Sequence, residues 1–458
     1  MVHSRMIVPI FLFFIVFGFL MIFVPAKVDK AEKTIYRSFR LISKQKAGQP
    51  LSPSKRNYYR VIGLLYLSIG IIVLANCRFQ LEKTDFGEKI SSRTRESQRT
   101  SDEASLHQTL NDIVQPLMEK HKHIGLAVAI IADEEKDISG FGRVNLDSDQ
   151  PPDGETIFEI GSISKAFTGI LLADMIDHKK LTIDTSVLSL LPSITINESS
   201  EKKGITLRHL VTHTSGLHRG PKSIFSLSSI WSSLIAGDSY RNYTEEMMLN
   251  AFSKKKLRNK PGKAFFYSNF GFGLLGLALS KKIGMDYHNM VRTIIAQPLG
   301  LKDTGVFLDE DQRSRLARGY RSYYHIRPFS FAQISDNWEF PDCTSGAGAL
   351  RSTANDMMVF LSANMGRTKS RLTPSLVSSH KVLFRDDKTE IGMGWLHESL
   401  PESGELIDWH NGLTGGYSSF MGFTENGRFG VVVLSNLAKK VDDIGFKILD
   451  SLVMAHRK

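Results

Sequence analysis

Residues 161–176 read Gly-Ser-Ile-Ser-Lys-Ala-Phe-Thr-Gly-Ile-Leu-Leu-Ala-Asp-Met-Ile, a polar start followed by a strongly apolar run. In residues 166–176 apolar side chains would occupy nearly every face of a helix, which predicts that this helix is buried. Ser162 and Lys165 are three positions apart, so on a helix the lysine amine can reach the serine hydroxyl. A lysine desolvated among apolar residues loses proton affinity and can act as a base. The stretch therefore predicts a nucleophile, Ser162, that is activated by Lys165.

The S-x-x-K pattern is a weak signal by itself, because it recurs in basic or polar stretches of the chain. The other copies are Ser43-Lys46, Ser52-Lys55, Ser200-Lys203 and Ser253-Lys256. An exposed serine and lysine are the simpler interpretation of those four. The copy at Ser162 differs from them because it opens a buried helix.

A candidate proton carrier lies in residues 261–271, which read Pro-Gly-Lys-Ala-Phe-Phe-Tyr-Ser-Asn-Phe-Gly. Pro-Gly favours a turn, and residues 270–279 continue as an apolar helix, which places Tyr267 at an element boundary. A lysine base needs a partner that passes the proton to the leaving group, and Tyr267 can do so. Y-x-N also occurs at Tyr240 and Tyr287, and a core tyrosine with a satisfied hydroxyl is the competing interpretation.

A third candidate lies in residues 407–417, which read Ile-Asp-Trp-His-Asn-Gly-Leu-Thr-Gly-Gly-Tyr, a strand-like run that enters a glycine-rich turn. A glycine inside a strand often marks the close approach of another backbone or a ligand, so His410 before Gly412 could face a pocket. H-x-G also occurs at His123 and His218. A histidine that merely packs at a strand end is the competing interpretation.

The ordered set S-x-x-K, Y-x-N and H-x-G resembles the three active-site motifs of the class C β-lactamase superfamily. That superfamily also holds D-alanyl-D-alanine carboxypeptidases, which are penicillin-binding-protein-like, together with aminopeptidases and esterases. The flanking text agrees, for example Ile-Thr-Leu-Arg-His-Leu-Val-Thr-His-Thr-Ser-Gly-Leu at 205–217, Gly-Ala-Gly-Ala-Leu-Arg-Ser-Thr at 346–353 and Gly-Met-Gly-Trp at 392–395. The resemblance covers roughly Ser105 to the C-terminus.

The resemblance implies an α+β fold, in which an antiparallel β-sheet flanked by helices joins a mostly helical subdomain near residues 180–330. The active site would lie between the two, and no metal or cofactor is implied. His209 and His213 resemble structural residues. The implied roles are Ser162 as acylated nucleophile, Lys165 as base, Tyr267 as second proton carrier, Asn269 as a residue that orients Lys165 and the substrate amide, the backbone N–H groups of Ser162 and Leu413 as oxyanion hole, and His410 with Gly412 as substrate-binding residues.

The third motif departs from the β-lactamase pattern, in which Lys-Thr-Gly usually stands where this chain has His410-Asn411-Gly412. A lysine is a fixed positive charge for a substrate carboxylate. A histidine is partly neutral near pH 7 and would bind that carboxylate more weakly and in a pH-dependent way. No dedicated water-activating glutamate is identifiable either. The histidine resembles the peptidase and esterase branches.

The resulting hypothesis is a serine hydrolase that acts through an acyl-enzyme on an envelope peptide or ester, in the manner of a D,D-peptidase or an esterase. One alternative is a sensor that binds acyl-D-Ala or β-lactam ligands without turnover. A second alternative is a β-lactamase. The G-x-S-x-G, H-E-x-x-H and P-loop patterns of other enzyme classes are absent from the sequence.

The charge distribution excludes a nucleic-acid binder and indicates a membrane-flanking segment. The net charge is +11, from 58 Lys and Arg against 47 Asp and Glu. Residues 1–100 hold 17 Lys and Arg against 6 Asp and Glu, so the whole positive excess lies there. Residues 101–458 hold equal numbers of positive and negative side chains. A nucleic-acid binder would need its basic patch on the folded domain.

Two uncharged apolar runs, residues 6–26 and 61–77, enclose a basic loop. The first run is long enough for a bilayer, which needs about 20 residues. By the positive-inside rule the loop is cytoplasmic, so we expect a membrane-anchored chain whose remainder is extracytoplasmic and touches lipid through these segments. The competing interpretation is a signal peptide, with lipidation at Cys77, because Leu74-Ala75-Asn76-Cys77 resembles a lipobox.

The expected organisation is an anchoring region at 1–77, a polar linker at 78–104 and a hydrolase domain at 105–458. Within that domain the pattern predicts a helix from Leu106, a strand over Gly125–Ala132 and a second strand around Asp137–Arg143. Cys77 and Cys343 indicate no disulfide framework. The oligomeric state stays open.

Overall fold

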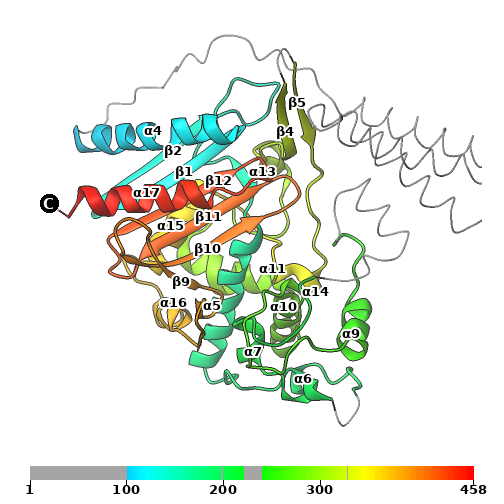
Figure 1. The fold of residues 1–458 in the computed structure, drawn as a ribbon. Coiled ribbons are helices and arrows are strands. Elements are labelled where there is room, and N and C mark those ends of the chain that lie inside the picture. Colours follow the sequence, from blue (N-terminus) through cyan, green and yellow to red (C-terminus); the bar gives the residue numbers. More distant parts are fainter. Residues whose placement is uncertain (1–100, 197–199, 221–239, 327–328, 458) are drawn as a thin grey trace, which may run out of the picture. The chain divides into compact units, whose positions relative to one another are not determined.

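An antiparallel sheet of eight strands forms the centre of the computed structural model, which describes residues 101–196, 200–220, 240–326 and 329–457 (Figure 1). The strand order is β2-β1-β12-β11-β10-β9-β8-β7, so the first two strands of the domain pair with its C-terminal strands. The predicted α+β class with an antiparallel sheet is confirmed. The strands are β1 (Gly125–Ala132), β2 (Glu135–Gly142), β7 (Phe384–Arg385), β8 (Glu390–Ile391), β9 (Leu396–Ser399), β10 (Leu406–Leu413), β11 (Ser418–Thr424) and β12 (Phe429–Ser435).

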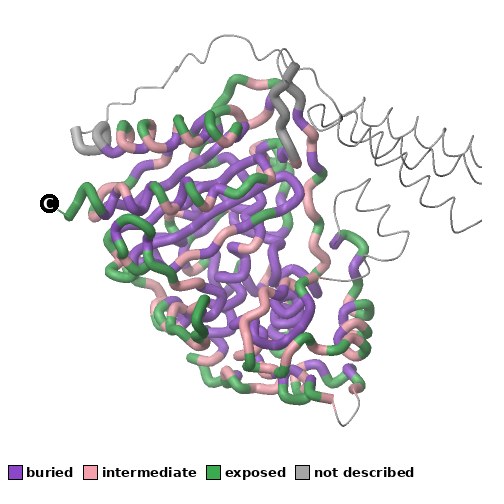
Figure 2. The backbone as a smooth tube through the Cα atoms, in the orientation of Figure 1, coloured by how far each residue is buried: buried purple, intermediate pink, exposed green. Residues whose placement is uncertain are grey.

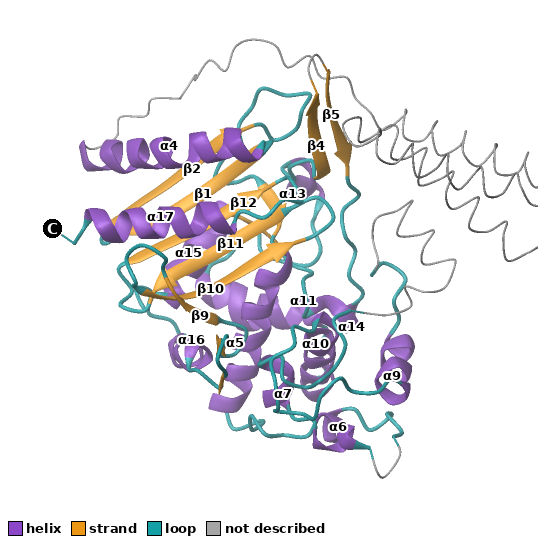
Figure 3. Ribbon diagram, in the orientation of Figure 1, coloured by secondary structure: helices purple, strands orange, loops and turns teal. Residues whose placement is uncertain are grey.

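Helices cover both faces of this sheet (Figure 3). Two helices from the ends of the domain lie on one face, and the helix that follows Ser162 packs with others against the opposite face (Figure 1). The covering helices are α4 (Ser101–His121) and α17 (Asp442–Ala455) on the first face, and α5 (Ser164–Asp177), α15 (Ala354–Asn364) and α16 (Thr373–His380) on the second side of the molecule.

Strand β1 is buried along its whole length because of this double cover. Val128 and Ile130 pack into the apolar cluster that includes α4 and α17. Ala129 and Ile131 alternate with them and pack into the larger cluster that includes α5 and α15. A strand buried on both faces needs apolar residues at every position, which explains the unbroken run over 125–132. Figure 2 shows the same burial through the central strands and the helix behind them.

The described residues of the segment predicted to form a mostly helical subdomain, near 180–330, are mostly helical, with one difference at its end. Its last residues form a β-hairpin of β4 (Tyr320–Ile326) and β5 (Phe329–Ile334) rather than helix. Helix α10 is the buried centre of the subdomain and ends at Gly284, whose φ of +74° suits a residue without Cβ. The helices are α6 (Val187–Leu190), α7 (Leu207–Val211), α9 (Glu245–Lys254), α10 (Asn269–Ile283), α11 (Tyr287–Met290), α12 (Gln297–Leu299) and α13 (Glu310–Ser314), with a π-helical turn over Val291–Ala296.

The first described helix, α4, begins at Ser101, four residues before the predicted domain start at Ser105. The predicted apolar segments at 6–26 and 61–77, Cys77 and residues 78–100 lie outside the described residues. In the part of the chain that the structure describes, no helix is both long and apolar enough to cross a membrane.

Candidate active site

Ser162 lies in a short 3-10 turn, η2 (Gly161–Ile163), that joins strand β3 (Ile157–Glu159) to helix α5. Gly161 has a φ of +51°, and a Cβ built on it would lie 2.8 Å from the backbone N of Leu413 on β10. A side chain at this position would therefore collide with β10 and strain the turn. The local sequence therefore forms a tight turn that places Ser162, the predicted nucleophile, next to the end of β10.

Lys165 and Ser162 are in contact as predicted. The Nζ atom of Lys165 lies 2.8 Å from Oγ of Ser162 and 2.5 Å from the carbonyl oxygen of Ala347. Lys165 is fully buried, and this burial, followed by the positive charge of Arg219, lowers its pKa well below the ordinary value of 10.5. A neutral amine can donate one N–H to the Ala347 carbonyl and receive the Ser162 proton on its lone pair.

Tyr267 lies beside this pair, at the entrance to α10. The centre of its ring is 4.9 Å from Nζ of Lys165. Burial raises the pKa of Tyr267 above its ordinary value of 10, and a hydrogen bond with Ser162 acts in the opposite direction. The phenol therefore holds its proton at neutral pH, which suits a proton donor rather than a base.

A buried histidine fixes the segment that carries Tyr267. Nδ1 of His213 accepts a hydrogen bond of 3.1 Å from the backbone N–H of Ser268, and its ring centre lies 4.3 Å from that of Tyr267. Burial, followed by the charge of Lys165, lowers the pKa of His213 well below 6.5, so its ring is neutral. Nδ1 of His209 accepts the backbone N–H of Thr206 at the start of α7. Both histidines hold backbone in place.

Asn269 forms no hydrogen bond with Lys165 in the described structure, although the resemblance implied that it orients the base. Its Nδ2 donates a hydrogen bond of 3.2 Å to the hydroxyl of Tyr240, and its Oδ1 has no hydrogen-bond partner among the described residues. The partners of the Lys165 amine are Ser162 and Ala347 instead. A buried acceptor without a partner is costly, so the Asn269 oxygen is suited to a donor on a bound molecule.

His410 lies on β10 near Tyr267, with 6.3 Å between the ring centres, but it is only 1% exposed. Burial, followed by the charge of Lys165, lowers its pKa to about 3. Its Nδ1 lies 2.6 Å from the backbone oxygen of Asn411. The expectation that His410 is partly charged near pH 7 is wrong, because the helices and strands around it remove the water that an imidazolium needs.

Gly412 allows β10 to approach the nucleophile turn backbone to backbone. A Cβ on Gly412 would lie 2.1 Å from the carbonyl oxygen of Ile160. The hydroxyl of Ser419 on the neighbouring strand donates a hydrogen bond of 2.8 Å to that same oxygen. The contact brings the backbone N of Leu413 next to the turn that holds Ser162, while the Leu413 side chain is 47% exposed. The oxyanion hole of Ser162 and Leu413 stays a prediction with a suitable geometry.

Three groups near the nucleophile have no role in the sequence-based prediction. Ala347 contributes only a backbone oxygen. Arg219 is exposed, and its Cζ lies 5.5 Å from the centre of the Tyr267 ring. Glu159 is buried beside Arg351 and accepts the backbone N–H of Trp338 at 2.9 Å, and burial raises its pKa to about 7. A backbone acceptor and a lone exposed arginine give no pattern in a sequence.

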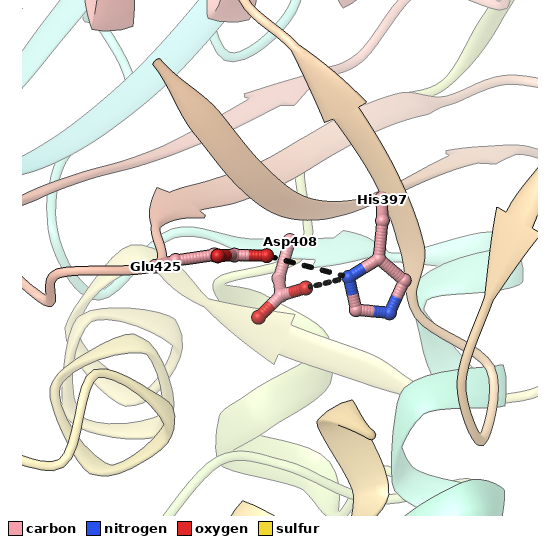
Figure 4. Close-up of side chains that lie close together, drawn as sticks. All are labelled: His397, Asp408 and Glu425. Atoms are coloured by element: carbon pink, nitrogen blue, oxygen red, sulfur yellow. Dashed lines mark ion pairs between the residues drawn. The ribbon is translucent and has the colours of Figure 1, made fainter. Parts of the chain in front are cut away.

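A second cluster of titratable side chains lies at the other end of β10. Figure 4 shows His397 on β9, Asp408 on β10 and Glu425 directly after β11. Nδ1 of His397 lies 2.6 Å from Oδ1 of Asp408 and 3.9 Å from Oε1 of Glu425. Two ligands of one zinc ion, each at about 2.0–2.2 Å from it, sit further apart than 2.6 Å in tetrahedral geometry. The close pair therefore fits a direct contact between His397 and Asp408 better than a metal centre.

The comparisons with known proteins agree with this geometry. The family model described as Beta-lactamase matches residues 110–449. A Beta-lactamase of Providencia stuartii is 27% identical over 300 residues, which cover 65% of this chain and 70% of that protein. Penicillin-binding protein 4* of Bacillus subtilis (strain 168) is 26% identical over 339 residues, which cover 71% of each chain.

Solved structures show the same fold at lower sequence identity. A class C beta-lactamase superposes with a TM-score of 0.66 at 23% identity, covering 78% of this chain and 99% of that one. A Beta-Lactamase/D-Alanine Carboxypeptidase from Pseudomonas syringae superposes with a TM-score of 0.63 at 18% identity, covering 77% and 99%. Since the family model spans most of the described residues, the chain belongs to the β-lactamase family of serine hydrolases.

Proposed function

We propose that the chain hydrolyses a peptide or ester of the cell envelope through an acyl-enzyme on Ser162, as a D,D-peptidase or an esterase does. The observation that supports this most is the buried Lys165 amine, 2.8 Å from Oγ of Ser162, with a pKa that burial lowers well below 10.5. A serine hydroxyl is a weak nucleophile until such a base is within hydrogen-bond reach.

In acylation, Lys165 takes the proton of Ser162 while Oγ forms a bond to the substrate carbonyl carbon. The negative charge that develops on the carbonyl oxygen is stabilised by the N–H groups of Ser162 and Leu413. The carbon–leaving-group bond then breaks, and Tyr267 gives its proton to the leaving group and regains one from Lys165. In deacylation a water molecule loses a proton to this pair and adds to the acyl carbon. The bond between that carbon and Oγ of Ser162 then breaks, and Oγ takes the proton back from the pair.

The unpaired Oδ1 of Asn269 supports a substrate that carries an N–H near the scissile bond. This atom has no hydrogen-bond partner among the described residues, and an amide N–H would satisfy it. A buried, neutral His410 argues against efficient β-lactam hydrolysis, because it cannot supply the fixed charge that Lys-Thr-Gly places there. We therefore rank the peptidase or esterase activity above a β-lactamase activity.

We further propose that the segments at 6–26 and 61–77 anchor the chain in a membrane and that the hydrolase domain works outside the cytoplasm. The concentration of the entire net charge of +11 in the first hundred residues supports this topology.

Covalent labelling tests the proposed function. The full chain is treated with a fluorophosphonate and with a fluorescent penicillin, and we expect labelling that Ser162→Ala abolishes. Ser253→Ala is the matched control, since Ser253 and Lys256 have the same spacing and lie on and just after α9, and labelling should persist. No labelling by either probe would refute the proposal. An acyl adduct that forms from a peptide or ester substrate and stays intact for hours by mass, with no product released, would favour the sensor.

A further inference from the structure

The backbone of Arg219 is fixed to the segment that carries Tyr267. Its carbonyl oxygen accepts hydrogen bonds from the backbone N–H groups of Asn269 at 2.7 Å and Phe270 at 3.2 Å. The hydroxyl of Ser268 donates a hydrogen bond of 2.7 Å to the carbonyl oxygen of His218, the preceding residue. Three hydrogen bonds therefore join residues 218–219 to the start of α10. They fix the backbone of Arg219 beside the candidate active site.

The Arg219 side chain extends from this fixed backbone toward Tyr267, and its guanidinium stays accessible. The side chain is exposed, and its Cζ lies 5.5 Å from the centre of the Tyr267 ring, within the range of a cation–π contact. The guanidinium donates no hydrogen bond to a side chain or backbone group in the described ranges, so its N–H groups can bind a ligand. Arg219 forms no ion pair with any residue in the described ranges.

Among the described residues, no negative charge balances that of Arg219. Its positive charge contributes to the low pKa values of Lys165 and His213 and opposes the high pKa of Tyr267. Among the described residues, no carboxylate contributes to the pKa of these three groups or of His410. The site thus has a positive charge beside Tyr267, and the described part of the chain supplies no ion-pair partner for it.

Three other groups near the site that can carry a positive charge are not available for a ligand. Arg351 is 5% exposed and is already bound to the carboxylates of Glu159 and Glu339. The amine of Lys165 is buried and engaged with Ser162. His410 is buried and neutral, although its motif usually carries the charge that binds substrate. Arg219 is therefore the exposed cation that the described residues place against the catalytic groups.

We propose that Arg219 binds a carboxylate of the substrate close to the scissile bond, and so replaces from another loop the positive charge that the third motif lacks. The planar guanidinium can bind both oxygens of a carboxylate at once. The inference rests on the proposed function and narrows its substrates to acyl compounds that carry a carboxylate within reach of Tyr267. The catalytic steps stay those of Ser162, Lys165 and Tyr267.

Two pairs of thioesters test the inference. The first pair is benzoylglycyl thioglycolate, with a carboxylate on the leaving group, and its neutral methyl ester. The second pair is glutaryl-N-acetylcysteamine, with a carboxylate on the acyl chain, and its methyl ester. For each pair the readout is the ratio of kcat/KM for the acid to kcat/KM for the methyl ester, which cancels any general loss of activity.

We expect Arg219→Gln to lower this ratio about tenfold for at least one pair, as the loss of one charge-assisted hydrogen bond would. Arg219→Lys, which keeps the charge, should retain most of the preference, and added salt should reduce it in the wild type. Lys282→Gln removes an exposed positive charge near the far end of α10 and is the matched control, with a ratio within about twofold of the wild type.

The outcomes separate the inference from the function on which it rests. If the wild type hydrolyses the thioesters and Arg219→Gln changes the acid-to-methyl-ester ratio of kcat/KM for neither pair, the inference is wrong. The proposed hydrolase function then stands. If the wild type hydrolyses none of the four thioesters and Ser162 takes no label, both are overturned.

Discussion

The Nζ atom of Lys165 lies 4.9 Å from the centre of the Tyr267 ring, and burial moves the pKa values of the two groups in opposite directions. The amine loses proton affinity, while the phenol holds its proton more tightly. Both groups therefore favour their uncharged forms, so the resting site contains one proton acceptor and one proton donor. Groups whose environments separate their pKa values in this way are suited to acid and base roles.

Lys165→Met should abolish the base while nearly preserving the volume of the side chain. We expect kcat to fall about 10²–10⁴-fold, the usual contribution of a positioned general base. The free energy of unfolding should stay the same or rise, because an amine that is costly to bury is replaced by an apolar group. Stopped-time thioester assays and urea unfolding measure the two quantities. A large loss of stability would show that the lysine holds the fold instead.

The activity should rise with pH through the pKa of Lys165 in the folded protein, because only the neutral amine can accept the Ser162 proton. This rise should occur well below pH 10.5, since burial lowers that pKa. His410 has a pKa of about 3 and stays neutral above it, so it should add no titration between pH 5 and 8. We expect His410→Asn to leave the midpoint of the rise in kcat/KM unchanged. A midpoint that moves by one pH unit or more would contradict the neutral assignment.

The stability of the domain should decrease as the pH falls from about 6.5 toward 4. Burial lowers the pKa of His380 to about 4 and that of His123 to about 3, both from 6.5. In this window the unfolded chain binds more protons than the folded one. The stability that the two neutral histidines contribute is therefore fully present above pH 6.5 and is lost progressively below it. Urea unfolding at pH 7 and pH 5 should show a smaller difference for His380→Gln than for the wild type. Equal differences would mean that His380 is not buried as a neutral ring.

Gly412→Ala should separate β10 from the nucleophile turn. A Cβ at this position would lie 2.1 Å from the backbone oxygen of Ile160, so one of the two backbones must move. We expect a loss of stability of about 1–3 kcal/mol, typical of overpacking, and a fall in kcat of about 10²-fold or more. Gly204→Ala is the control, because a Cβ there would meet nothing within 4 Å. Normal activity in Gly412→Ala would show that the backbone N–H of Leu413 is not part of the oxyanion hole.

The fold was predictable where the sequence pattern is local and strong. The unbroken apolar run of β1 gives the same bounds in sequence and structure, because a doubly covered strand needs no alternation. The helix was predicted from Leu106, five residues after the start of α4 at Ser101, since its first turn is polar and shows no periodicity. The hairpin of β4 and β5 was not predicted, although its two strands are neighbours in sequence. One end of it is also held by distant residues, since the backbone N–H of Tyr320 donates to the oxygens of Gly416 and Asn436.

The candidate site was predictable through its motifs and not through its environment. Ser162 and Lys165 are neighbours in sequence, so their contact follows from helical spacing. The burial of His410 depends on elements far away in the chain, and the sequence therefore suggested a partly charged ring. The contact of Asn269 with Tyr240 was missed for the same reason. Arg219 was missed because one exposed arginine after a structural loop resembles any other.

Gly161 and Gly412 let two stretches of main chain meet without any side chain between them. In the proposed mechanism, the amide groups of Ser162 and Leu413 would face the reacting carbonyl of every substrate and would distinguish none. Side chains that could distinguish substrates, such as Arg219, stand at the rim and contribute nothing to this junction. A descendant of this chain could acquire a new substrate through substitutions of side chains around the site, such as Arg219. Ser162, Lys165 and Tyr267 would then stay unchanged.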